Sequence, residues 1–189
     1  MVLLNPAIAS AEAFRVILDA MARPGRISNL GDVQDMLPLV NSTWTVLLTL
    51  CDHATGVFLP ADYAASSVIS ALQFHAGARI VADPAQAAFV LAKASDATAL
   101  LAACDMGSPE YPDRSATLII QCNELNHNGV TLSGPGIQTT QGFGAVGMDA
   151  GFWQALSERR QYYPRGTDLF FTAPGQISAI PRSTRIEVR

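Results

Sequence analysis

The first apolar pattern along the chain has the period of an α-helix. Ser10 stands where an N-terminal cap is expected, and Pro24-Gly25 provides a stop signal. Four apolar residues between them follow the i, i+3, i+4, i+7 spacing of one helix face: Phe14, Ile17, Leu18 and Met21. We therefore predict an amphipathic helix with one face in the core.

Further helices are expected in the first half of the chain. Residues 44–51 are apolar at most positions, which predicts a helix buried on most sides. A helix over residues 62–77 would begin at Asp62, as its cap, and end near Gly77. Another is expected over residues 95–107, capped by its first or second residue.

Short strand-like runs alternate with these helices. They are bounded by turn signals and cover residues 27–30, 57–60, 79–82 and 88–92. Such alternation is typical of an α/β or α+β layer fold.

The second half of the chain has the turn signals of antiparallel hairpins. Two pairs of strand-like runs share this feature: 116–124 and 130–132 around Asn128-Gly129, and 167–172 and 177–180 around Pro174-Gly175. Hairpins next to alternating helices and strands predict a mixed sheet. The fold class is therefore α/β, with a single domain over residues 1–189 and a mixed β-sheet flanked by helices.

The segment between the two hairpins is rich in glycine. Residues 134–136 are expected to close the first hairpin, and the glycines of residues 142–147 to keep the next stretch flexible. Asp149 is placed to cap a last helix that carries Phe152 and Trp153.

Composition and charge narrow the function classes. The 189 residues are 49% hydrophobic and 15% charged, which indicates a compact globule, and the mean hydropathy of +0.23 favours apolar surface covered by a partner. The net charge of −4 and the pI of about 5.2 argue against a nucleic-acid binder. No apolar run reaches the roughly 18 residues that span a bilayer, and no signal peptide is recognisable. We expect a cytoplasmic protein that binds neither nucleic acid nor membrane.

Signals for catalysis and metal binding are weak. Lys93, the only lysine, has no glycine-rich anion loop or acidic motif beside it, and the G-x-G-x-x-G pattern of residues 142–147 follows no buried strand. The three cysteines and three histidines are not spaced as metal ligands, and His75, near a helix end, suits a capping or core-bonding imidazole. The residues therefore predict no catalytic residue, no cofactor and no metal site.

Arginines near the second hairpin are the best candidates for binding. Arg165, Arg182 and Arg185 could hold a phosphate, or the carboxylates of a neighbouring subunit, in a bidentate manner. We expect Arg182 to form an intermolecular ion pair. A ligand site would use Arg165 and Arg182 together with Gly134 and Gly136.

Several short blocks, in order along the chain, resemble one family. They are Phe14-Arg15, Met21, Pro24-Gly25, Phe74-His75, residues 132–137, residues 163–169, Pro174-Gly175 and residues 179–184. Together they resemble the PhnH subunit of the bacterial carbon-phosphorus lyase system, over residues 6–188.

The resemblance implies a non-catalytic or accessory subunit of a larger enzyme. Such a subunit assembles with PhnG, PhnI and PhnJ and supports formation of ribose 1-alkylphosphonate 5-triphosphate from ATP and an alkylphosphonate. The fold implied is that of a truncated pyridoxal-phosphate transferase large domain without the cofactor.

Two alternatives to the subunit stay open. One is a stand-alone transferase that anchors pyridoxal phosphate on Lys93. The other is a module that binds a small ligand at the arginines and glycines named above. The resemblance and the apolar composition also predict a homodimer of the isolated chain, anchored by Arg182, Phe152 and Trp153.

Overall fold

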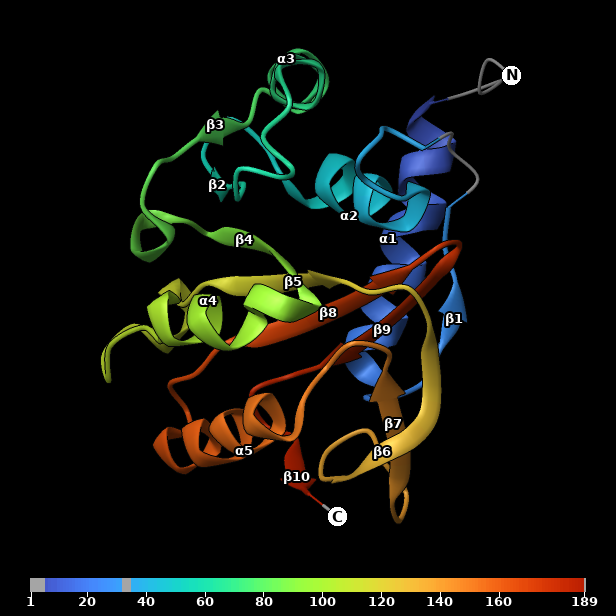
Figure 1. The fold of residues 1–189 in the computed structure, drawn as a ribbon, viewed down its shortest axis with the longest axis vertical. Helices are drawn as coiled ribbons and strands as arrows, with labels where there is room; N and C mark the ends of the chain where they lie inside the picture. Colours follow the sequence, from blue (N-terminus) through green and yellow to red (C-terminus); the bar gives the residue numbers. More distant parts are fainter. Residues whose placement is uncertain (1–5, 32–34, 189) are drawn as a thin grey trace.

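The computed structural model describes residues 6–31 and 35–188, which contain a seven-stranded mixed sheet (Figure 1). Its strands are β1 (Ser28–Asn29), β2 (Gly56–Phe58), β3 (Arg79–Ile80), β4 (Phe89–Lys93), β5 (Thr117–Gln121), β8 (Asp168–Ala173) and β9 (Gln176–Ile180). The order across the sheet is β1-β9-β8-β5-β4-β2-β3. Pairing is parallel from β8 to β3 and antiparallel at β8–β9 and β9–β1.

Helices cover both faces of this sheet. On one face lie α1 (Pro6–Ala22), α2 (Asn41–Leu50) and α3 (Ser66–Ala76), and on the other lie α4 (Ala97–Ala103) and α5 (Ala150–Arg159) (Figure 1). The α5 side also carries a three-stranded antiparallel sheet, made of β6 (Leu125–Ser133), β7 (Gln141–Ala145) and β10 (Arg185–Glu187). The predicted mixed α/β sheet flanked by helices is confirmed.

Strand β5 shows how the sequence divides the core in two. Ile119 is fully buried among side chains of the α1, α2 and α3 layer, whereas Leu118 and Ile120 are fully buried on the α4 and α5 side. Successive side chains of a strand point to opposite faces, so a continuous apolar run suits a strand covered on both sides. Each of these side chains contributes about 1.5–3 kcal/mol by its burial.

The C-terminal hairpin is confirmed. β8 and β9 pair with Leu169 opposite Ile180, and Gly175 in the turn has a φ of +69°, where glycine is favoured. This pairing brings the start of β8 next to the residues that follow β9.

The first predicted hairpin is wrong. β5 has only parallel strand neighbours in the large sheet, and β6 pairs with β7 instead. Asn128-Gly129 lies inside β6, where the register with β7 shifts between Asn126 and Val130. The stretch predicted to be flexible contains β7, and Gly144 of that strand has no room for a side chain, because a Cβ there would collide with the Asn128 carbonyl oxygen.

Several predicted helix ends also differ. α1 begins at Pro6, before the expected cap Ser10. α3 begins only at Ser66, with Ala65 and not Asp62 at its N-cap position, and the Asp62 carboxylate pairs with Lys93. Gly77 does end α3, with a φ of +65°. The Asp149 cap is confirmed by a hydrogen bond of 2.7 Å from the Phe152 amide to Asp149 Oδ1.

The apolar face of α5 fills the core beneath the sheet. Phe152 is 0% and Trp153 5% exposed, and both rings pack against Phe171 of β8 and one another. A side chain without exposed surface cannot contact a partner while the core stays closed. These two residues therefore do not supply surface anchors for an interface.

Resemblance to a pyridoxal-phosphate transferase domain finds no support. The structure shows a mixed sheet with helices on both faces and a small second sheet, which is the coarser α/β architecture alone. Within residues 6–31 and 35–188, no helix is long and apolar enough to cross a membrane.

Candidate functional site

A cavity of about 500 Å³ opens near the start of β8, and we call it the arginine cavity. Segments from three parts of the chain form it: the turn after β6, the short helix η4 (Arg160–Tyr162) that continues α5, and the stretch joining β9 to β10. Its lining residues are Gly134, Pro135, Arg160, Tyr163, Arg182, Ser183, Thr184 and Arg185.

Arg182 is held in this cavity by a carboxylate of its own chain. Its guanidinium donates to both oxygens of Asp168, with Nε–Oδ1 and Nε–Oδ2 distances of 3.2 and 3.1 Å and an Nη2–Oδ2 distance of 2.5 Å. The Arg182 amide donates to Asp168 Oδ1 at 2.7 Å, and Nη1 donates to the Pro112 carbonyl oxygen. Arg182 thus has an intramolecular partner in place of the intermolecular one that was expected.

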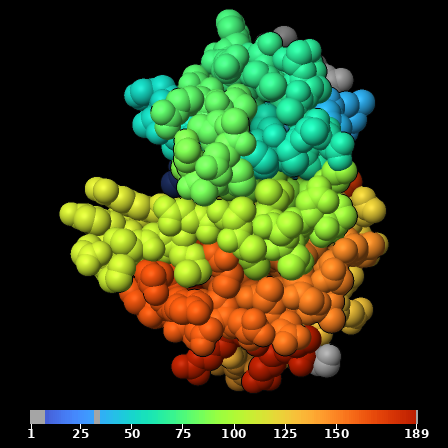
Figure 2. All heavy atoms as spheres, turned by 60° about the vertical axis from the view of Figure 1, so that its left-hand side comes forward, coloured from blue at the N-terminus to red at the C-terminus, as the bar shows by residue number. Residues whose placement is uncertain are grey.

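The Pro112 contact ties the cavity to a projecting loop. Residues 105–115 follow α4 and extend from the body of the molecule, in yellow in Figure 2. On this loop the Arg114 guanidinium lies 4.1 Å from the centre of the Tyr111 ring. Arg182 therefore links the start of β8 to a loop that reaches outward.

Arg160 is a half-buried cation of the cavity. Its Nη1 donates to the Thr167 carbonyl oxygen at 3.0 Å and its Nη2 to the Ile180 carbonyl oxygen at 3.5 Å. Among the described residues its Nε has no hydrogen-bond partner. Burial lowers the pKa of Arg160 to about 10, and of the nearby charges Asp168 opposes that shift while Arg159 and Arg182 add to it.

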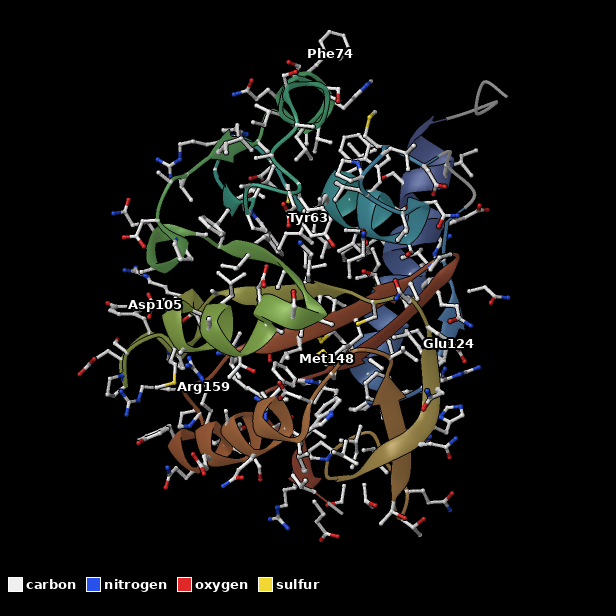
Figure 3. All side chains as sticks on the ribbon, in the orientation of Figure 1. Tyr63, Phe74, Asp105, Glu124, Met148 and Arg159 are labelled. Atoms are coloured by element: carbon white, nitrogen blue, oxygen red, sulfur yellow. The ribbon has the colours of Figure 1, made fainter. Side chains whose placement is uncertain are left out.

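A second arginine, Arg159, contacts the same residue, Thr167. Arg159 donates from Nη2 to the Cys104 carbonyl oxygen at 3.0 Å and to Thr167 Oγ1 at 3.4 Å, between α4 and α5 (Figure 3). Burial also lowers the pKa of Arg159. Both arginines are thus held by neutral oxygen acceptors.

Thr184 lies in the wall with its hydroxyl buried. It is 0% exposed, and in the part of the chain that the structure describes its Oγ1 has no hydrogen-bond partner. Gly134 allows the turn after β6 to lie close to the Ser183 backbone. It has a φ of +126°, and a Cβ there would lie 3.2 Å from the Ser183 carbonyl oxygen. The cavity wall thus brings three arginines together, while the unpartnered atoms of Arg160 and Thr184 are buried inside the wall.

A second cavity, of about 330 Å³, lies at the carboxyl ends of the parallel strands, and we call it the lysine cavity. Lys93 ends β4 there and pairs with Asp62. Gln121 ends β5, accepting from the Val40 amide at 3.1 Å and donating to the Pro38 carbonyl oxygen at 3.1 Å. The remaining lining residues are Val40, Tyr63, Ala94, Ser95, Cys122, Asn123, Val146, Gly147 and Pro174.

Two titratable groups of the lysine cavity are kept neutral. Tyr63 lies between α2 and β4 (Figure 3), and burial raises its pKa to about 12. Burial likewise raises the pKa of the Cys122 thiol to about 12. Neither group is prepared to act as a base or nucleophile near neutral pH. Across residues 6–31 and 35–188, no three His, Cys, Asp or Glu side chains gather as metal ligands.

Comparison with known proteins covers nearly the whole chain. A family model described as bacterial phosphonate metabolism protein (PhnH) matches residues 3–187. The chain belongs to the PhnH family. It is similar to the α-D-ribose 1-methylphosphonate 5-triphosphate synthase subunit PhnH of Rhizobium meliloti (strain 1021), with 31% identity over 97% of this chain and 92% of the relative. It is also similar to the putative C-P lyase subunit protein HtxG of Stutzerimonas stutzeri, with 32% identity over 94% of this chain and 85% of that protein.

The PhnH blocks of the C-terminal third converge on the arginine cavity. Of the four predicted ligand residues, Gly134 and Arg182 line it together. Gly136 does not: it packs against the end of α1, where a Cβ would collide with the Ala22 carbonyl oxygen. Arg165 is not among the lining residues, and its guanidinium lies 5.6 Å from the centre of the Tyr162 ring.

Sequence reasoning missed Arg160 and Thr184. A signal for Arg160 was present, because it follows Phe152 and Leu156 at i+4 steps and so continues the buried stripe of α5 into η4. A cation on an apolar stripe needs a partner inside the protein. Thr184 had no comparable signal.

Proposed function

We propose that this chain is an accessory subunit, without a catalytic site of its own, of the carbon-phosphorus lyase core complex. The observation that carries the proposal is the match of residues 3–187 to the PhnH family model. It is supported by a relative, 31% identical along 97% of the chain, that is named as a subunit of a ribose 1-methylphosphonate 5-triphosphate synthase. A match of this length covers every element of the fold.

In this role the chain supports formation of ribose 1-alkylphosphonate 5-triphosphate from ATP and an alkylphosphonate. Its partners are the PhnG, PhnI and PhnJ subunits, and it works in the cytoplasm as one domain. The lysine cavity fits a structural role better than catalysis. Lys93, the only lysine, is ion-paired with Asp62 at a solvent-exposed position.

Exposed apolar side chains support an assembly. Phe74 on α3 is 83% exposed and points away from the molecule (Figure 3), and Leu37, in the segment before α2, is 77% exposed. Phe14 and Leu18 leave a further apolar strip on the outer side of α1. Aromatic and large aliphatic groups are enriched at the centres of protein interfaces. We propose these residues as the anchors in place of Phe152 and Trp153.

Co-expression with the PhnG, PhnI and PhnJ subunits tests the proposal. An affinity tag on PhnI should recover this chain in a fixed ratio, and Phe74→Ser should reduce the recovery. Tyr111→Ser, which changes an aromatic residue 52% exposed on the 105–115 loop, is the matched control and should leave it unchanged. If the unaltered chain never associates with the other subunits, the proposal is wrong.

The isolated chain is proposed to pair with itself through the same apolar surface. Sedimentation should then give about twice the chain mass of 20.1 kDa. A two-fold dimer repeats each contact, so a single substitution acts twice. A monomer at micromolar concentration would contradict the dimer without affecting the complex.

A further inference from the structure

The residues around the arginine cavity carry an excess of positive charge. Three of the eight lining residues are arginines, and none of the eight is acidic. Asp168 pairs with Arg182, whereas Arg160 and Arg185 form no salt bridge with any described residue. Glu187 lies two positions from Arg185 on β10 without pairing with it. The mouth of the cavity is therefore cationic, in a chain whose formal net charge is −4.

The donors that an outside group can reach lie on the rim of this cavity and not inside its wall. Arg185 is exposed and Ser183 is half-buried, and neither side chain has a hydrogen-bond partner in the part of the chain that the structure describes. Tyr163 is 62% exposed and lines the same space. A guanidinium, a hydroxyl and an aromatic side chain are therefore accessible together at one opening.

A second arginine extends this rim. The Arg165 guanidinium lies 5.6 Å from the centre of the ring of Tyr162, a residue that is 45% exposed. Gly166 places this pair beside the cavity, because a Cβ on Gly166 would lie 3.2 Å from Arg182 Cβ. Stacking on a ring leaves the N–H groups of a guanidinium free to bind a carboxylate. Tyrosine and arginine are also among the residues most enriched at the energetic centres of protein interfaces.

Backbone hydrogen bonds hold the rim in place without a partner. The Arg165 amide donates to the Tyr162 carbonyl oxygen at 3.0 Å. The Gly166 amide donates to the Met106 carbonyl oxygen at 3.0 Å, which joins this turn to the segment that follows α4. A surface that is fixed in advance loses little conformational entropy on binding, so more of its contact energy appears as affinity.

We propose that this rim is a docking surface for an acidic segment of a protein partner. The rim consists of Tyr162, Tyr163, Arg165, Ser183 and Arg185. A carboxylate of the partner accepts hydrogen bonds from Arg185 and Ser183 at the cavity mouth, and the apolar residues beside it pack on the two tyrosine rings. The negative net charge of the chain disfavours nucleic acid and anionic membrane as occupants. The proposal rests on the accessory-subunit role, because the partner is another subunit of that complex.

Oxidative footprinting of tyrosines tests the surface in the complex assembled with PhnG, PhnI and PhnJ. Tyr163 should be modified in the isolated chain and protected in the complex, because the partner covers the cavity mouth. Tyr111, 52% exposed on the 105–115 loop, is the internal control and should be modified in both. A complex that contains this chain and leaves Tyr163 as reactive as before would overturn the proposal.

Charge reversal tests the acidic nature of the partner. Arg185→Glu changes an exposed side chain, so its circular dichroism should stay native, and recovery of the chain on tagged PhnI at low salt should fall about tenfold. Arg185→Lys keeps the charge and should recover most of the loss. Arg114→Glu makes the same charge change on an arginine that also stacks on a tyrosine, Tyr111, and should leave recovery unchanged.

The outcomes separate this surface from the accessory-subunit role. If the unaltered chain is recovered and both Arg185→Glu and Tyr163→Ser are recovered equally well, the docking surface is wrong and the role stands. If the unaltered chain is never recovered, both proposals are wrong. Protection of Tyr163 in the isolated chain at micromolar concentration would assign the rim to a second copy of this chain and would also overturn the acidic partner.

Discussion

The arginine cavity and the lysine cavity differ in how their polar groups are satisfied. In the lysine cavity Lys93 pairs with Asp62, and the Gln121 side chain bonds both the Val40 amide and the Pro38 carbonyl oxygen. In the arginine cavity Asp168 is used by Arg182, while Arg160 and Thr184 keep buried donors without partners. These side chains of the lysine cavity satisfy one another, whereas the wall of the arginine cavity carries the desolvation cost of polar atoms without partners.

The largest expected effect comes from removing the carboxylate of the arginine cavity. Asp168→Asn keeps the side-chain shape but leaves Arg182 and Arg160 without a counter-charge. We expect the free energy of unfolding to fall by about 2–4 kcal/mol, somewhat below the loss for a fully buried pair because both partners keep about a fifth of their side-chain exposure. Urea denaturation measures it. A loss below about 1 kcal/mol would show that the pair behaves as a surface ion pair.

Alkaline pH should change the stability contributed by the two cavities in opposite directions. The pKa of Cys122 rises from 9.0 to about 12 on folding, so the folded state keeps a proton that the unfolded state loses, and stability falls as pH rises from 9 toward 12. The loss from this thiol is on the order of 1 kcal/mol at pH 10. Burial lowers the pKa of Arg160 to about 10, so above pH 10 the folded state loses a proton that the unfolded state keeps. The free energy of unfolding that depends on Arg160 therefore rises with pH above 10.

Cys122→Ala isolates the thiol in that experiment. The unfolding free energy of the variant should fall less steeply than that of the parent chain between pH 8 and 10, whatever its value at pH 8. Cys104→Ala, another buried thiol with a pKa raised to about 12, should change the slope by a similar amount. Equal slopes for all three proteins would mean that these thiols do not ionise on unfolding in this range.

A matched pair of threonine substitutions compares a satisfied hydroxyl with an unsatisfied one. Thr172 Oγ1 lies 2.7 Å from Thr43 Oγ1 and 3.3 Å from the Ile120 carbonyl oxygen, so Thr172→Val should cost about 1–2 kcal/mol. Thr184→Val loses no hydrogen bond and should be neutral or stabilising by up to about 1 kcal/mol. Thermal unfolding of the two variants without ligand measures the difference, and equal losses would contradict it.

The smallest effect is expected at the exposed pair of the lysine cavity. Asp62→Asn breaks its contact with Lys93, whose side chain is 37% exposed against 59% for Asp62. Solvent screens a pair of this kind, so stability should change by less than about 1 kcal/mol. Denaturation at low and high salt is the measurement. A loss as large as that of Asp168→Asn would remove the distinction between the two cavities.

Local signals in the sequence were enough for some elements and insufficient for others. The β8–β9 hairpin was predictable because Pro174-Gly175 separates two apolar runs that pair with each other. Asn128-Gly129 led to a wrong hairpin prediction, because the same dipeptide occurs in tight turns and at register shifts inside a strand. Pairing with the distant strand β7 decides between the two, and no local pattern shows it. The arginine cavity was predictable at Gly134 and Arg182, but its hydroxyl depends on the path from β9 to β10, which no local pattern encodes.

The packing of α1 on β9 sets the order in which the fold can be completed during synthesis. Ile17 and Ala20 of α1 belong to the same buried cluster as Ile177 and Ala179 of β9, so the first helix, which also packs on α2, is fully covered only after nearly the whole chain has left the ribosome. β8 must also arrive before β5 has neighbours on both sides. Fragments that stop before residue 168 expose both the unpaired edge of β5 and the apolar face of α1, which makes nascent chains the species most prone to aggregate.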